Sequence, residues 1–275
     1  MLWRMVEGAV VQGWLDRYAS AWEHRDVAAV KSLFDDDASY RSFIFGEAHR
    51  GRDGVGAYWR RATATQSGVT VRFGAPIVDG DRVAVEWWTL MDDAEEDGPI
   101  TLPGVLLLRF REGLCSELRE YWHLKEGRVE PYSGWGEFPE GETRVTRGCA
   151  ALWARAYERA WNAGDPRAAA ALYSFDVTSR THPFREPSRG RAGVLSYTQE
   201  AYASERATHS RFGVPFVKDG GAAVEWWATY LEVGSPKTLA GCSVLAFDAA
   251  GLVISARDYW HDTTPHLAPP PEWGT

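Results

Sequence analysis

The sequence is poor in cysteine. Its three cysteines, Cys115, Cys149 and Cys242, form no C-x-x-C pair and leave one thiol over in any pairing. Cysteine-ligated metal sites need closely spaced ligand pairs, so no such site is predicted. An odd number of scattered thiols is typical of a reducing compartment, and the sequence therefore predicts reduced cysteines and a cytoplasmic location.

Clustered positive charge is also missing. The formal net charge is -8 and the sequence pI is about 5.4, and the arginines are interleaved with aspartate and glutamate. A protein that binds nucleic acid needs lysine and arginine gathered on one face to contact phosphates. We therefore expect no nucleic-acid partner.

No apolar run is long enough for a signal peptide or a membrane span. The N-terminal residues 1–7 meet a charge and then a glycine before such a run develops, so no membrane partner is predicted. With 45% hydrophobic and 25% charged residues, the composition is typical of a globular protein that buries a core. The 14 tryptophans are an excess that must line cores, an interface or a cavity.

The sequence contains a long internal repeat. Residues 119–123 (Arg-Glu-Tyr-Trp-His) return as residues 257–261 (Arg-Asp-Tyr-Trp-His), and residues 18–22 are matched by residues 157–161, 139 positions later. A period of this length predicts two duplicated domains, since solenoids are built from much shorter units. The predicted organisation is a first domain over residues 1–133, a linker over 134–148, a second domain over 149–264 and a proline-rich, extended tail over 265–275.

Each copy is predicted to begin with helices and to end with strands. Apolar residues recur at helical spacing over 10–21, and Asp26 is placed to cap a second short helix. Helices followed by an antiparallel run of strands are typical of an α+β fold in which a curved sheet folds over the helices as a cone. The further predicted elements are a strand over 38–45, a helix over 53–64 and strands over 70–74, 82–91, 101–111 and 114–123.

Three motifs carry a resemblance to a known family. They are Ala-Trp-x-x-x-Asp (21–26), Gly-Arg-x-Gly (51–54) and the closing Arg-acid-Tyr-Trp, all repeated in the second half. With the order of elements, they resemble the nuclear transport factor 2-like superfamily, and within it the SnoaL-like polyketide cyclase branch. The resemblance implies two tandem cone-shaped α+β barrels. It also implies that the halves pair inside one chain as a pseudo-dimer, which is compatible with a monomer, because family members commonly dimerise through the outer sheet face.

The resemblance assigns an acid/base carboxyl to the position seven residues after a turn glycine, which is Glu120 in the first copy and Asp258 in the second. Strand alternation predicts that Glu120 and Trp122 point into the cone while Arg119 points away from it. A carboxyl among apolar rings is desolvated, which raises its pKa toward neutral pH and enables it to take and return a proton. The alternative is that each acid pairs with a nearby arginine or tyrosine and only orders the cavity.

The sequence also departs from patterns of the superfamily. In the epoxide-hydrolase branch, a catalytic arginine and aspartate occupy the places held here by Trp87 and Thr89, and by Trp226 and Ala228. Without these charges, direct epoxide hydrolysis loses most of its expected catalysis. The histidine that such cyclases place near their acid has no clear counterpart, although His182 could point inward from its hairpin arm.

Two classes of function follow. The first is an enzyme that uses neither cofactor nor metal and catalyses cyclisation, isomerisation or dehydration of a hydrophobic small molecule, with Glu120 and Asp258 as acid/base groups. The second is a non-catalytic small-molecule binding protein or a pseudo-dimer scaffold. An open, largely apolar cavity around a carboxyl would favour the enzyme. The predicted substrate-binding residues are Tyr40, Trp87, Trp122, His182, Trp226 and Trp260.

Overall fold

A computed structural model describes residues 6–96, 98–138, 147–218 and 220–275. The chain divides into two compact units, residues 1–137 and 138–275, and each is described by itself. The expectation for residues 1–7 rests largely on residues outside the described part of the chain, and most of the predicted linker also lies outside it.

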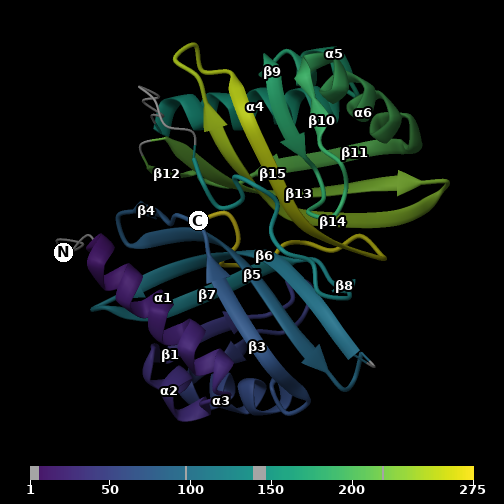
Figure 1. The fold of residues 1–275 in the computed structure, drawn as a ribbon. Coiled ribbons are helices and arrows are strands. Elements are labelled where there is room, and N and C mark those ends of the chain that lie inside the picture. The colour runs from purple at the N-terminus through teal and green to yellow at the C-terminus, as the bar shows by residue number, and fades with distance from the viewer. Residues whose placement is uncertain (1–5, 97, 139–146, 219) are drawn as a thin grey trace. The chain divides into compact units, whose positions relative to one another are not determined.

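The first unit has three helices on one face of a curved, mostly antiparallel sheet (Figure 1). The strand order is β2-β1-β7-β6-β5-β3, with β4 and β8 added to β5 and β6, and β1 runs parallel to β7. The elements are α1 (Gly8–Glu23), α2 (Val27–Ser32), β1 (Phe34–Arg41), β2 (His49–Arg50), α3 (Gly51–Ala62), β3 (Gln66–Phe73), β4 (Ile77–Asp79), β5 (Arg82–Asp93), β6 (Gly98–Arg111), β7 (Leu114–Trp122) and β8 (Lys125–Glu126).

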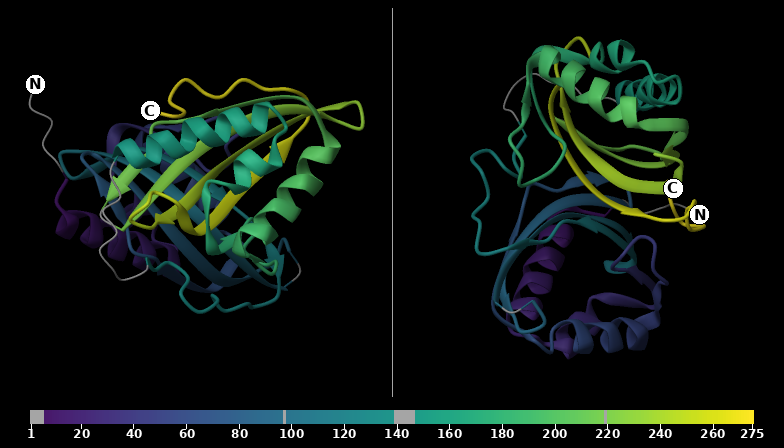
Figure 2. Two further views of the ribbon diagram at one scale, coloured as in Figure 1. Left: turned by 90° about the horizontal axis from the view of Figure 1, so that it is seen from above. Right: turned by 90° about the vertical axis from the view of Figure 1, so that its right-hand side faces the viewer.

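The second unit repeats this arrangement (Figure 2). Its strand order is β10-β9-β15-β14-β13-β11, with β12 paired to β13. The predicted α+β class and the tandem duplication are confirmed, and in the described residues each sheet curves without closing into a barrel. The elements are α4 (Arg147–Asn162), α5 (Pro166–Ala170), β9 (Tyr173–Arg180), β10 (Ser188–Arg189), α6 (Gly190–Ser204), β11 (Glu205–Phe212), β12 (Phe216–Lys218), β13 (Gly221–Glu232), β14 (Ser235–Phe247) and β15 (Val253–Thr263).

Local sequence explains the helices that open each unit. In α1 the residues Val11, Trp14 and Tyr18 recur at helical spacing and are buried in the core. The predicted cap of α2 is present, because the side chain of Asp26 accepts a hydrogen bond from the Ala29 N–H at 2.9 Å. Burial of one face and a satisfied N-terminus together hold these short helices.

The strand predicted over 38–45 occurs over 34–41 instead. Its first half, Asp35 to Asp37, is acidic and therefore does not resemble a strand in sequence. Arg111 on the neighbouring hairpin lies 3.3 Å from an Asp35 oxygen and 3.1 Å from an Asp37 oxygen. Arg111 thus places a positive charge beside this acidic stretch.

Each unit ends in a segment that packs on its own sheet, and this extends the repeat beyond the predicted domain ends. In the first unit Trp88 Nε1 donates to the Val129 carbonyl at 2.8 Å, and its ring contacts Trp135. In the second, Trp227 Nε1 donates to the Leu267 carbonyl at 3.0 Å and its ring contacts Trp273. The predicted tail is thus the counterpart of residues 127–137, of which 134–137 belong to the predicted linker.

Substitution of Gly74 tests whether the terminal segment packs against the sheet in this way. A Cβ at Gly74 would lie 2.6 Å from Gly136 Cα, which is backbone and cannot move aside cheaply. We expect Gly74→Ala to lower the free energy of unfolding by about 1–3 kcal/mol, measured by urea denaturation. Gly13→Ala is the control, because nothing lies within 4 Å of its added Cβ in α1 and the change should stabilise the protein by up to about 1 kcal/mol. Equal effects of the two changes would contradict the packing argument.

Candidate functional site

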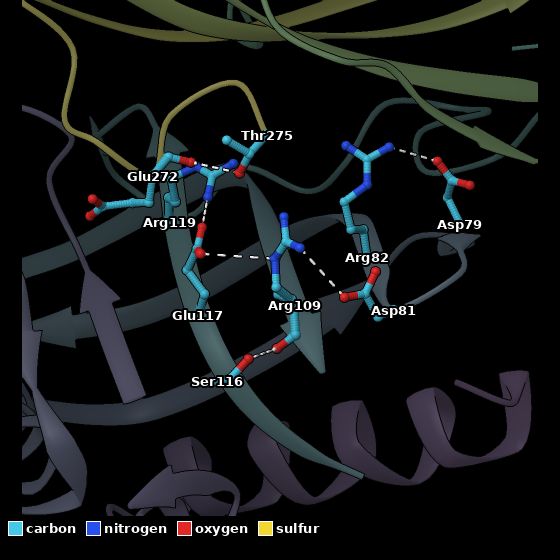
Figure 3. A network of polar contacts seen from close by, with 9 residues as sticks. All are labelled: Asp79, Asp81, Arg82, Arg109, Ser116, Glu117, Arg119, Glu272 and Thr275. Atoms are coloured by element: carbon cyan, nitrogen blue, oxygen red, sulfur yellow. Dashed lines mark hydrogen bonds and ion pairs between the residues drawn. The ribbon is translucent and has the colours of Figure 1, made fainter. Parts of the chain in front are cut away.

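The hairpin between β6 and β7 places Glu120. Gly113, with φ +81°, makes the turn, and the antiparallel register sets Glu120 opposite Leu106. Alternation along β7 sends Leu118 into the core and Glu120 and Trp122 to the wall of a cavity. The side chain of Arg119 forms an ion pair with Glu117, two residues away on the same face of the strand (Figure 3).

The first cavity has a volume of about 300 Å³ and a mainly aromatic wall. Among the described residues that line it, Glu120 is the one ionisable carboxyl, and no lysine or arginine lines it. This arrangement is a small apolar chamber with a single acidic group, as expected of a small-molecule site. Its aromatic lining includes Tyr18, Trp22, Tyr40, Tyr58, Trp59, Trp87 and Trp122.

Glu120 is held by a chain of tyrosines. Tyr40 Oη donates to Glu120 Oε1 at 3.0 Å, and Tyr18 Oη lies 3.0 Å from Tyr40 Oη. Because Tyr40 uses its proton on Glu120, Tyr18 must be the donor to Tyr40. Burial raises the pKa of Glu120 to about 8, and the hydrogen bond from Tyr40 lowers it in part.

The indole groups of this cavity differ in their hydrogen bonds. Trp22 Nε1 donates to Gln66 Oε1 at 2.8 Å, and Trp122 Nε1 donates to the Ser42 carbonyl at 2.8 Å. The buried Nε1 atoms of Trp59 and Trp87 have no acceptor among the described residues. Neither nitrogen is exposed to the cavity, and that of Trp87 packs against Gly104.

The described lining of the first cavity has neither the arginine nor the aspartate that the epoxide-hydrolase branch places on this strand, β5. Trp87 lines the cavity where that branch has an arginine. Thr89, at the aspartate position, is fully buried. Gly104 lies opposite Trp87 in the register, and a Cβ there would lie 2.6 Å from the indole nitrogen. The glycine thus allows the indole to occupy this part of the wall.

The second unit has a larger and more polar cavity, of about 410 Å³, which Asp258 lines. Ser243 Oγ donates to Asp258 Oδ1 at 2.7 Å and accepts from Trp226 Nε1 at 3.0 Å. The first unit has Leu106 at the place of Ser243. Burial raises the pKa of Asp258 to about 6, and the serine bond opposes that rise.

The predicted substrate-binding residues fall into two groups. Five of the six lie on cavity walls, whereas His182 is not among the residues that line the second cavity. The His182 ring packs instead at a centroid distance of 6.0 Å from Trp260, and its Nδ1 accepts the Phe184 N–H at 3.2 Å. Lining the first cavity are Tyr40, Trp87 and Trp122; lining the second are Trp226 and Trp260.

Sequence reasoning missed other wall residues. Tyr18 belongs to the repeated Tyr-x-x-x-Trp motif, which in the sequence serves only as evidence of the duplication. In the structure its hydroxyl contacts that of Tyr40, which in turn donates to Glu120. Glu205 occupies the position in the second copy that Gln66 occupies in the first, 139 residues earlier. This difference in charge between the copies is the sequence signal that could have identified Glu205. Over the described parts of the chain, no group of three His, Cys, Asp or Glu side chains is arranged to hold a metal ion.

Comparisons with known proteins agree on the fold family. The SnoaL-like domain family model matches residues 15–118 and again residues 154–256. No curated protein matches the chain. No helix in the described residues is long and apolar enough to cross a membrane.

Three solved structures are similar to parts of the chain. One is a hypothetical protein with a ketosteroid isomerase-like fold from Catenulispora acidiphila, in complex with trimethylamine; it is 24% identical, covers 39% of this chain and 83% of its own, and has a TM-score of 0.37. TsrD from Streptomyces laurentii is 16% identical over 42% of this chain and 90% of its own, with a TM-score of 0.38. An epoxide hydrolase of the LEH-like type from M. tuberculosis is 16% identical over 42% and 84%, with a TM-score of 0.37.

Proposed function

The chain belongs to the SnoaL-like domain family, and we propose that its first domain is an acid/base enzyme that acts, without a cofactor, on a hydrophobic small molecule. The observation that carries this proposal is the position of Glu120, which is 5% exposed, lines an aromatic cavity and has a pKa raised to about 8 by burial. The reaction we infer is the movement of a proton next to a carbonyl group.

The chemistry of the cavity supports this step. A carboxyl whose pKa lies near the working pH both takes and returns a proton efficiently. In its ionised form Glu120 would remove the proton from a carbon beside the carbonyl. Isomerisation, cyclisation and dehydration share this first step, so the proposal covers all three outcomes.

Isotope exchange tests the proposal without knowledge of the product. A panel of hydrophobic cyclic ketones would be incubated with the protein in deuterated water, and deuterium beside the carbonyl would be followed by mass spectrometry. We expect exchange above the uncatalysed rate for at least one ketone. If ketones bind in the first cavity but exchange deuterium no faster than without the protein, the enzyme hypothesis is rejected. That result would favour the alternative, a non-catalytic binding module.

The tyrosine chain gives a prediction about pH. The rate of exchange should rise with pH and level off above about 8, because ionised Glu120 is the base. Tyr40→Phe removes the hydrogen bond that stabilises the carboxylate, so the rise should move to higher pH. Measurement of kcat/KM against pH for both proteins checks this. If the pH profile of Tyr40→Phe is the same as that of the wild type, Tyr40 does not affect the pKa of Glu120.

Two wider features are part of the proposal. None of the three described cysteines forms a disulfide, and Cys115 and Cys242 are buried, which supports a reducing, cytoplasmic setting. The duplication supports pairing of the two domains within one chain, with the hydrophobic ligand as the main partner. Light scattering that reports a mass near 30.7 kDa would support a monomer of this kind.

A further inference from the structure

The second cavity is rich in negative charge. Five carboxyl side chains lie among the described residues that line it, and Arg185 is the single basic side chain in that set. One of the five, Asp262, is 3.3 Å from Lys237 Nζ, which offsets part of its charge. The carboxyl residues are Glu200, Glu205, Glu232, Asp258 and Asp262.

The duplication supplies an internal comparison. At the places of Glu200 and Glu205, 139 positions earlier, the first domain has Arg61 and Gln66, and at the place of Asp262, 138 positions earlier, it has Leu124. Each of the three differences makes the second domain more negative. The charge is therefore a property of the second domain and is not dictated by the shared fold.

Two of these carboxyls face each other. Glu205 on β11 and Glu232 on β13 are directly opposite in the antiparallel register, whereas the first domain pairs Gln66 with Asp93 at that place. Like charges in this arrangement destabilise a sheet. Burial raises the pKa of Glu205, and the charge of Glu232 adds to the rise. A cation between the two carboxyls would relieve this repulsion.

Aromatic rings form a large part of the remaining wall. They belong to tyrosines and tryptophans from α4, α6 and the sheet, and aromatic faces attract organic cations by about 0.5–2 kcal/mol per contact. The Nε1 atom of Trp153, whose side chain is 4% exposed, has no acceptor among the described residues. This nitrogen is shielded from the cavity, so Trp153 contributes its ring to the wall. The rings used in this argument are those of Trp153, Tyr157, Trp161, Tyr197, Trp226 and Trp260.

We propose that the cavity of the second domain binds a small organic cation, an amine or a quaternary ammonium compound. The cationic group lies near Glu205 and Glu232 and against the aromatic wall. This site is separate from Glu120 and holds its ligand whether or not the first domain is an enzyme.

Calorimetric titration of the full chain with three probes tests the proposal. Choline carries a quaternary ammonium and a hydroxyl, 3,3-dimethylbutan-1-ol is its neutral isostere, and protonated dimethylethanolamine distinguishes a tertiary amine from a quaternary one. We expect choline or dimethylethanolamine to bind at least about tenfold more tightly than the isostere. Equal affinity for the neutral isostere, or no binding of either cation at millimolar concentration, would overturn the proposal.

Variants assign the binding to these carboxyls. Glu205→Gln restores the first domain's residue and is expected to weaken cation binding at least about fivefold without affecting the isostere. Glu200→Arg changes an exposed residue on α6 and should weaken cation binding in the same direction. Glu96→Gln removes the same charge from an exposed loop of the first domain and should have no effect. The assignment would be refuted if Glu96→Gln lost as much affinity for the cation as Glu205→Gln. It would also be refuted if Glu205→Gln bound the cation as tightly as the wild type.

Discussion

Replacement of Glu120 by glutamine is expected to lower turnover by about 10²- to 10⁴-fold, the range that a positioned acid/base group contributes. Glutamine has nearly the same shape as glutamate and still accepts a hydrogen bond from Tyr40, but it cannot take a proton. The cavity wall is left in place, so the ligand should bind almost as before. The measurement is kcat and KM in the deuterium-exchange assay, with a circular dichroism spectrum to show that the fold is retained.

Asp258→Asn is the matched control. It makes the same chemical change at the equivalent strand position, but in the cavity that we assign to cation binding. We expect its turnover to stay within about twofold of the wild type, because no proton passes through Asp258 in the proposed reaction. Turnover lost in Asp258→Asn and kept in Glu120→Gln would move the active site to the second domain. Turnover unchanged in the double variant would reject both assignments.

The sequence predicted the fold because its signals are local and occur twice. Helical spacing in residues 10–21, the cap at Asp26 and the alternation of residues 118–122 each depend on near neighbours, and the repeat showed where each domain recurs. The same alternation was enough to place Glu120 and Trp122 on the wall of the cavity. The resemblance implied barrels, but in the described residues each sheet stays open, because closure depends on strand pairing between residues far apart in sequence.

Features that depend on contacts across the fold escaped prediction. The hydroxyls of Tyr18 and Tyr40 meet although the residues are 22 positions apart on a helix and a strand. The opposition of Glu205 and Glu232 depends on the register of two strands, which composition does not reveal. Trp135 was assigned to a linker because its neighbours are glycine and glutamate, and only its contact with Trp88 shows that it belongs to the first unit.

Stability should depend strongly on pH because of the same burial that suits Glu120 to catalysis. In the native protein the pKa of Glu120 is raised from 4.5 to about 8. The native state therefore binds this proton more tightly than the unfolded chain, and the resulting stability is fully present below pH 4.5 and is lost as the pH rises to about 8. The difference between the two pKa values corresponds to roughly 5 kcal/mol, which is comparable to the whole stability of many domains.

Urea denaturation of the wild type and Glu120→Gln at pH 5, 7 and 9 measures this contribution. Asp258, whose pKa is raised from 3.8 to about 6, acts in the same direction at lower pH, but it is present in both proteins and cancels in their difference. The two free energies of unfolding should be similar at pH 5, and at pH 9 the variant should be more stable by several kcal/mol. A difference that stays constant from pH 5 to 9 would mean that Glu120 ionises as easily in the native protein as in the unfolded chain. It would then lack the raised pKa on which its proposed role as a base depends.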